Sequence, residues 1–148
     1  MRRVTLVRHA QAAGAAASGR DFDRPLTESG VAEARKTAVA LLAQRAIPDL
    51  LVASAAVRTV QTVTLLQDLA FPGTSLVVEP ALYLASADAL LDYLRTLDDG
   101  LAHVLVVGHN PGISDCCRLL AADGREASLG TAKWRRFERA VDRWADLR

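Results

Sequence analysis

The sequence has few cysteines, and the two that it contains are adjacent, Cys116 and Cys117. Neighbouring residues in a helix point in different directions, so a bridge between these two thiols is disfavoured. Their spacing also matches no zinc or redox motif. We therefore expect two small buried hydrophobic residues in a protein of the reducing cytoplasm.

An excess of charge of one sign and long hydrophobic runs are also absent. The formal net charge is +1, which argues against a protein that coats nucleic acid. The arginines near Trp134 and Trp144 are interleaved with acidic residues, so they indicate a solvated face over packed aromatic side chains. The apolar run near the start is too short for a signal peptide or a membrane span. We expect a single domain over residues 1–148, cytoplasmic, with neither nucleic acid nor membrane as partner.

The chain does contain an apolar strand that ends in basic residues. Val4–Val7 is followed directly by Arg8 and His9, and ligands bind at the carboxyl ends of strands in open α/β sheets. An imidazole can attack phosphorus, and a guanidinium offers a fork of donors that matches phosphate oxygens. The pair therefore indicates phosphoryl chemistry.

Two further strands end in the same way. Residues 49–53 lead into a helix with Arg58, and residues 103–107 lead into Gly108-His109-Asn110-Pro111-Gly112, whose glycines allow a ligand to approach the backbone closely. His103, at the start of that strand, is expected to be structural.

Helices are expected between the strands. Thr27 and Ser86 are suitable N-caps for two of them. The expected helices span about 28–45, 57–69, 87–97 and 112–122, and two more strands span 75–78 and 131–138, before a short segment 140–148. This alternation predicts an α/β fold, a three-layer α/β/α arrangement with a mainly parallel sheet.

A parallel sheet would bring the three strand ends to one rim. The residues gathered there are Arg8, His9, Arg58 and His109, with Arg24 in the loop after the first strand. Guanidinium and imidazole groups without an acidic cluster suit a dianionic phosphoryl group better than a metal ion. We expect no metal and no cofactor.

Four segments at this rim resemble the signature blocks of the histidine phosphatase superfamily. They are Leu6–Ala10, Arg24–Gly30, Ser54–Thr62 and Val107–Gly112. They occur in the family's order and spacing, and the short chain is similar to the SixA-type phosphohistidine phosphatases. The resemblance implies a histidine phosphatase-like fold and a reaction that needs no metal.

The resemblance also implies a role for each basic residue. His9 becomes the phosphorylated nucleophile, Arg8 and Arg58 clamp the phosphate, and His109 is a further phosphate ligand and transition-state donor. Arg24 matches a substrate-binding arginine of the SixA type. In-line attack requires a neutral His9 whose other ring nitrogen is held by a backbone carbonyl, and cationic neighbours should lower its pKa.

The chain departs from the family's pattern at two positions. Ala10 stands where glycine is commonest, a change that costs little space. Larger family members have a carboxylate general acid after the third strand, where Glu79 is a candidate and a solvated strand-end charge is the alternative. A weak or missing acid favours cleavage of a P–N bond, because imidazole leaves without further protonation more readily than an alkoxide.

The leading hypothesis is therefore a phosphatase that works through a phosphohistidine at His9, with a protein phosphohistidine as substrate. A second hypothesis is a phosphatase of small phosphate esters, or a mutase. A third, from another class, is a non-catalytic module that binds phosphoproteins.

Overall fold

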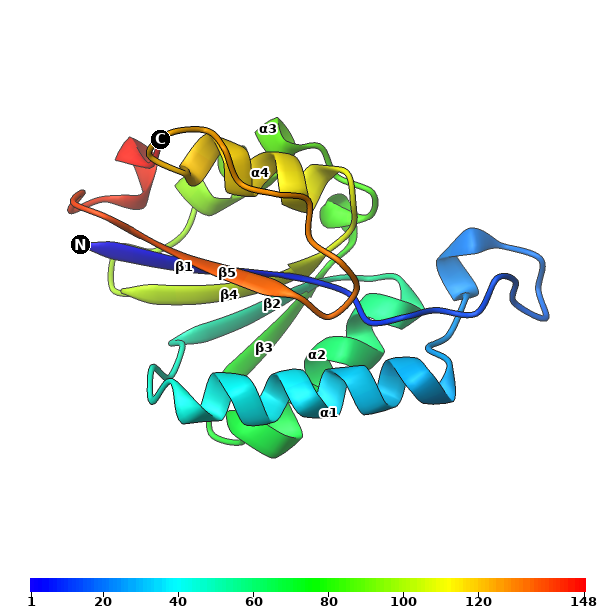
Figure 1. Ribbon diagram of the computed structural model, residues 1–148. Coiled ribbons are helices and arrows are strands. Elements are labelled where there is room, and N and C mark those ends of the chain that lie inside the picture. The colour runs from blue at the N-terminus through cyan, green and yellow to red at the C-terminus, as the bar shows by residue number, and fades with distance from the viewer.

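The strands assemble into one five-stranded sheet with helices on both faces, in a computed structural model that describes residues 1–148 (Figure 1). The order across the sheet is β3-β2-β4-β1-β5. The strands are β1 (Arg2–Arg8), β2 (Leu50–Ser54), β3 (Ser75–Glu79), β4 (His103–Gly108) and β5 (Trp134–Arg139). All neighbouring pairs are parallel except β1 with β5, which is antiparallel. The predicted α/β fold with a mainly parallel sheet is confirmed.

Two helices cover each face of the sheet. The helices α1 (Glu28–Ala43) and α2 (Val57–Ala70) lie on one face, and α3 (Ala87–Arg95) and α4 (Gly112–Leu120) lie on the other (Figure 1). Short 3-10 helices are η1 (Asp21–Asp23), η2 (Pro80–Leu82) and η3 (Trp144–Asp146). The central strands β2 and β4 are buried because they contact helices on both faces, as their continuous apolar sequences require.

Local sequence signals explain where two helices begin. Thr27 accepts a hydrogen bond from the Gly30 backbone N–H at 3.0 Å and caps α1, and Ser86 accepts one from Ala89 at 3.2 Å and caps α3. Both predicted caps are confirmed. Three of the helices end two residues earlier than predicted, and α2 ends one residue later.

The end of the chain packs more closely than the sequence suggests. The strand predicted from residue 131 begins at Trp134, and the terminal segment contains η3. Trp144 of η3 is completely buried, and its Nε1–H donates to the Leu101 carbonyl at 2.8 Å. Cys116 and Cys117 are buried free thiols, as expected. No helix is both long and apolar enough to cross a bilayer.

Candidate active site

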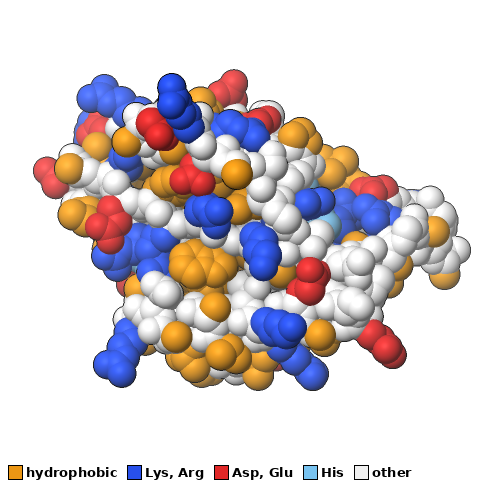
Figure 2. Space-filling model, viewed as in Figure 1, with side chains coloured by type: hydrophobic (Ala, Val, Ile, Leu, Met, Phe, Trp, Pro, Cys, Tyr) orange, Lys and Arg blue, Asp and Glu red, His pale blue; other side chains and the backbone are white.

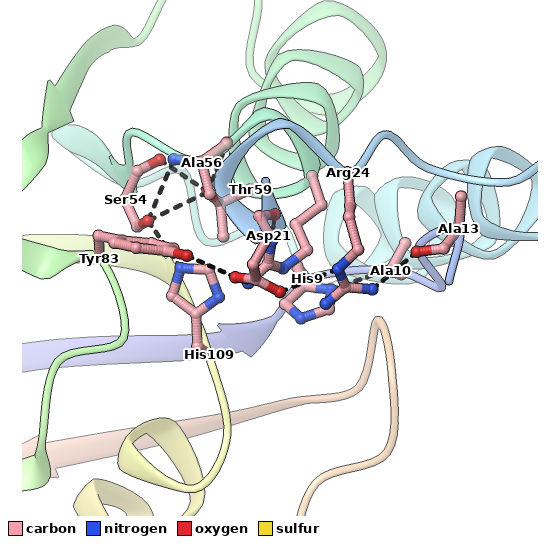
Figure 3. Close-up of polar contacts among 11 residues, drawn as sticks. His9, Ala10, Ala13, Asp21, Arg24, Ser54, Ala56, Thr59, Tyr83 and His109 are labelled. Atoms are coloured by element: carbon pink, nitrogen blue, oxygen red, sulfur yellow. Dashed lines mark hydrogen bonds and ion pairs between the residues drawn. The ribbon is translucent and has the colours of Figure 1, made fainter. Parts of the chain in front are cut away.

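His9 follows the last residue of β1 and lies at the carboxyl edge of the sheet. Its Nδ1 is 2.7 Å from the carbonyl oxygen of Ala10 (Figure 3). A carbonyl only accepts, so Nδ1 donates its proton and Nε2 keeps a free lone pair. The predicted arrangement of the ring is confirmed.

The environment keeps His9 neutral. Its pKa is lowered to about 4, first because the ring is buried and then because of the positive charges of Arg58, Arg8 and Arg24. The sequence led us to expect the effect of the cations, but burial is the larger cause. At neutral pH the imidazole is therefore available as a nucleophile.

His109 follows β4 and faces His9 across a ring-centroid distance of 5.5 Å. Its Nε2 is 2.7 Å from the hydroxyl of Ser54, at the end of β2. This hydroxyl accepts the Ala56 backbone N–H and the Thr59 hydroxyl, which occupy both of its lone pairs, so its own proton is available for Nε2 and Nδ1 then bears the ring proton. Figure 3 shows that Nδ1 is turned toward the side where His9 lies. Burial and the charge of Arg58 lower the pKa of His109 to about 3, so this ring is a neutral donor.

Of the five buried side-chain nitrogens without a partner in the protein, three lie around this site. They are Arg8 Nε, Arg58 Nε and His109 Nδ1. Buried polar atoms without a partner are rare in proteins, and these three belong to residues that line one pocket. An anion with several acceptor oxygens would satisfy them together.

The outer side of Arg58 is held by a residue that the sequence analysis did not identify, Asp21 of η1. Arg58 Nη1 donates to the Asp21 backbone carbonyl at 2.8 Å, and Nη2 donates to its carboxylate at 3.0 Å. Arg24 Nε donates to the other carboxylate oxygen at 2.9 Å, and the Tyr83 hydroxyl donates to the same oxygen as Arg58 (Figure 3). The Tyr83 hydroxyl and these guanidinium groups hold the pKa of Asp21 well below its usual range. Asp21 is therefore a carboxylate that fixes the two arginines and stays ionised.

Tyr83 forms an aromatic wall beside the pocket. Its ring packs edge-on against His109 at 5.6 Å and against Phe22 at 5.0 Å. The role of Tyr83 was also missed, because nothing in the local sequence links it to a turn 62 residues earlier.

Side chains of α2 hold the loop after β1 by hydrogen bonds to its backbone. The Ala10 backbone N–H donates to Thr62 of α2 at 3.1 Å, and the Leu26 N–H donates to Gln61 at 2.7 Å. Ala10 is fully buried against Ala34 and Ala132, so the methyl group at this position is accommodated by packing.

The structure brings all five predicted site residues to one pocket of about 380 Å³. Its lining consists of Arg8, His9, Gln11, Ala12, Asp21, Arg24, Arg58, Leu84, His109, Asn110 and Thr131. Glu79 does not line it, and its carboxylate instead accepts the Ala81 N–H at 3.2 Å. His103 is the first residue of β4 and so lies at the opposite end of this strand from the pocket. It is buried and forms a hydrogen bond with Thr5. No cluster of three or more His, Cys, Asp or Glu side chains is placed to hold a metal ion.

Comparison with known proteins defines the class. The family model for the histidine phosphatase superfamily, branch 1, matches residues 4–83. The chain belongs to this superfamily.

Within the superfamily the chain is SixA-like. A candidate phosphohistidine phosphatase SixA from Agrobacterium tumefaciens is 33% identical, with 91% of this chain and 90% of that chain covered and a TM-score of 0.83. The protein histidine phosphatase SixA in complex with tungstate is 30% identical over 88% of this chain and 83% of that chain, with a TM-score of 0.78. An uncharacterized chloroplast protein of Arabidopsis thaliana is 30% identical over 129 residues, and the chain spans 59% of its length.

Proposed function

We propose that this protein is a metal-independent phosphatase that removes the phosphoryl group from phosphohistidine in proteins. The observation on which the proposal rests is a neutral His9, with Nε2 free, in a pocket whose three unpartnered donors suit a phosphoryl group. A SixA relative whose structure was solved in complex with tungstate, a tetrahedral oxyanion, supports the proposal.

The first step transfers the phosphoryl group to His9. Nε2 forms a bond to phosphorus while the P–N bond of the substrate breaks, and the substrate imidazole leaves with the electron pair. A substrate ring protonated on its other nitrogen leaves as neutral imidazole, so no further proton is needed. Arg8, Arg58 and His109 stabilise the charge on the equatorial oxygens.

The second step releases phosphate. A water molecule attacks phosphorus, the bond to His9 Nε2 breaks, and both water protons remain on the released dihydrogen phosphate. The proton on Nδ1 stays there throughout, hydrogen-bonded to the Ala10 carbonyl oxygen, so the ring returns to the tautomer in which it began.

The carboxylates of the site favour phosphohistidine over an ester. An alkoxide leaving group requires a proton donor. Glu79 lies outside the pocket, and Asp21 is held ionised by Tyr83 and two arginines. The pocket therefore holds no protonated carboxylic acid, and a leaving group that departs without one is the better substrate.

The experiment is phosphate release, with a chelator present, from a protein phosphohistidine and from an aryl phosphate. We expect turnover of the phosphohistidine that is unaffected by chelation and falls on the order of a thousandfold or more in His9→Ala. Glu79→Gln serves as a control and should retain both rates, because this side chain does not reach the pocket.

Each other outcome selects another function. Turnover of the aryl phosphate alone would indicate a phosphatase of small esters. Binding of phosphate without turnover of either substrate would indicate a phosphoprotein-binding module.

A further inference from the structure

Two further hollows lie beside the pocket along the edge of the sheet. Thr131 lines both the pocket and a second hollow of about 380 Å³ between α1 and the segment before β5. Lys133 and Trp134 in turn line both this hollow and a third one of about 600 Å³, which runs along β5 to Glu138. The shared residues place the three hollows next to one another in a row, and we call the second and third together the β5 groove.

Basic side chains outnumber acidic ones in the β5 groove. The charged residues that line it are Lys36, Lys133, Arg135 and Arg136, with Glu33 and Glu138. Figure 2 shows this face, on which Lys and Arg side chains surround an apolar patch near the centre, with the histidine-containing pocket to the right.

Of the two carboxylates in the groove, only Glu138 is neutralised by a cation, so Glu33 leaves one negative charge against three unpaired positive ones. Glu138 pairs with Arg3 on the neighbouring strand. Glu33 accepts the Gln11 backbone N–H at 2.8 Å and the Thr131 hydroxyl at 2.9 Å, so it ties the loop after β1 to the groove.

Three of the four cations have no acidic partner. Arg135 pairs with Glu126 outside the groove, whereas Lys36 and Lys133 are exposed and form no ion pair. The Arg136 guanidinium lies over the Trp134 ring at 5.3 Å and donates to Thr5, again without a carboxylate. Uncompensated positive charge beside a catalytic pocket attracts an acidic partner.

The groove also follows an open strand edge. β5 is the last strand of the sheet and pairs only with β1. Its six residues span about 20 Å, at the usual rise of a strand. An extended segment of similar length, on the order of six residues, fits beside such an edge.

We propose that the β5 groove binds an acidic segment of the phosphorylated protein, next in sequence to the phosphohistidine in the pocket. This inference rests on the proposed function, because it requires the phosphoryl group to be on a polypeptide. The groove then selects among phosphoproteins by the charge around the modified histidine, while the pocket performs the chemistry.

Two synthetic phosphohistidine peptides test the proposal. One has six glutamates flanking the phosphohistidine and the other has six glutamines, and each is assayed as substrate and as inhibitor of aryl phosphate turnover. We expect the wild-type KM of the glutamate peptide to be lower by about tenfold. In the variant Lys36→Glu/Lys133→Glu this preference should disappear, with kcat and the aryl phosphate parameters unchanged.

A matched control separates the groove from net charge. Arg35→Glu/Arg125→Glu also takes the net charge from +1 to −3, since each substitution changes it by −2, and both arginines are exposed, unpaired and outside the groove. It should keep the preference for the glutamate peptide.

The outcomes distinguish the two proposals. Equal KM values for the two peptides in the wild type, or a preference that survives in the lysine variant, would overturn the groove. Peptides that are neither hydrolysed nor inhibitory, with aryl phosphate still turned over, would overturn the proposed function and the groove with it.

Discussion

Asp21 organises the pocket at the scale of single residues. Its carboxylate joins Arg24, Arg58 and the Tyr83 hydroxyl, three groups from separate parts of the chain. Asp21 accepts hydrogen bonds from both Nη atoms of Arg58. The Nε atom of Arg58 has no partner in the protein and therefore remains for the substrate. Asp21 is thus a positioning residue, and its negative charge also prevents the arginines from repelling one another.

The variant Asp21→Asn tests this role. The carboxylate accepts from three donors, and the NH2 group of asparagine would be a donor that faces one of them. We therefore expect the arginines to separate and the KM for either substrate to rise by about tenfold or more. Steady-state kinetics with aryl phosphate and phosphohistidine peptide would measure it.

Asp23→Asn is the matched control for this prediction. Asp23 lies in the same 3-10 turn but bonds only to Ser18 and Arg20. Equal effects of the two variants on KM would show that the turn matters and the carboxylate of Asp21 does not.

The basic residues of the site were predictable, and the groups that hold them were not. Arg8, His9 and His109 follow apolar strands, a position that a one-dimensional pattern reveals. Asp21 and Tyr83 meet only after the loop and η2 have packed, and no periodicity relates residues so far apart in the chain. Their roles therefore depend on tertiary geometry.

At the scale of elements, the start of α4 shows how closely segments must approach behind the site. A Cβ atom on Gly112 would lie 1.8 Å from the carbonyl oxygen of Ala85, just before α3. The sequence suggested that this glycine gives a ligand access to the backbone. The structure shows that the room is taken by Ala85, so glycine is required there for helix packing.

Gly112→Ala should therefore displace α4 and disturb His109, three residues earlier. We expect a loss of about 2 kcal/mol in the free energy of unfolding, typical of overpacking, and reduced turnover. Urea denaturation and phosphate release would measure the two effects.

Gly73→Ala provides the comparison, because nothing lies within 4 Å of a Cβ atom at Gly73. Its stability should change by less than about 1 kcal/mol. If Gly112→Ala were as stable as Gly73→Ala, close packing at the start of α4 would not be needed.

Elements with a strong apolar pattern were predicted well, and those at the edge less so. β2 and β4 are buried on both faces and read as apolar runs. β5 is an edge strand that contacts solvent, and its sequence, Trp-Arg-Arg-Phe-Glu-Arg, is therefore largely polar. Without an apolar run to mark it, the start of β5 was predicted three residues too early. The 3-10 helix η1 lacks buried residues and so leaves no pattern to detect.

At the scale of the whole molecule, all three histidines are buried and resist protonation. Burial is the first cause in each case, and the pKa values fall to about 4 for His9 and His103 and to about 3 for His109. In the unfolded chain these groups titrate near 6.5. Between these values the unfolded state therefore binds more protons than the folded state.

Stability should consequently rise with pH up to about 6.5 and fall on acidification below it. The slope is at most about 1.4 kcal/mol per pH unit for each histidine that is charged only in the unfolded state. Thermal unfolding between pH 5 and pH 8 would measure it, with a plateau expected above pH 7. A Tm that stays constant from pH 8 to pH 5 would contradict the buried, neutral state of these rings.

The sheet gathers the chemistry of the whole molecule at one edge. The parallel strands β1, β2 and β4 end together, and the sequence allowed this convergence to be predicted because only the strand order and direction were needed. The β5 groove could not be predicted, because it depends on how an antiparallel edge strand lies beside α1.

The most direct measurement is the capture of the phosphorylated enzyme. Protein mixed with phosphohistidine peptide is denatured at alkaline pH within the first turnover, digested and mapped by mass spectrometry. We predict a phosphoryl group on the peptide that contains His9, attached to Nε2, and no such group after reaction of His9→Ala. Turnover with a phosphoryl group on another residue, or turnover by His9→Ala as rapid as that of the wild type, would contradict catalysis through His9.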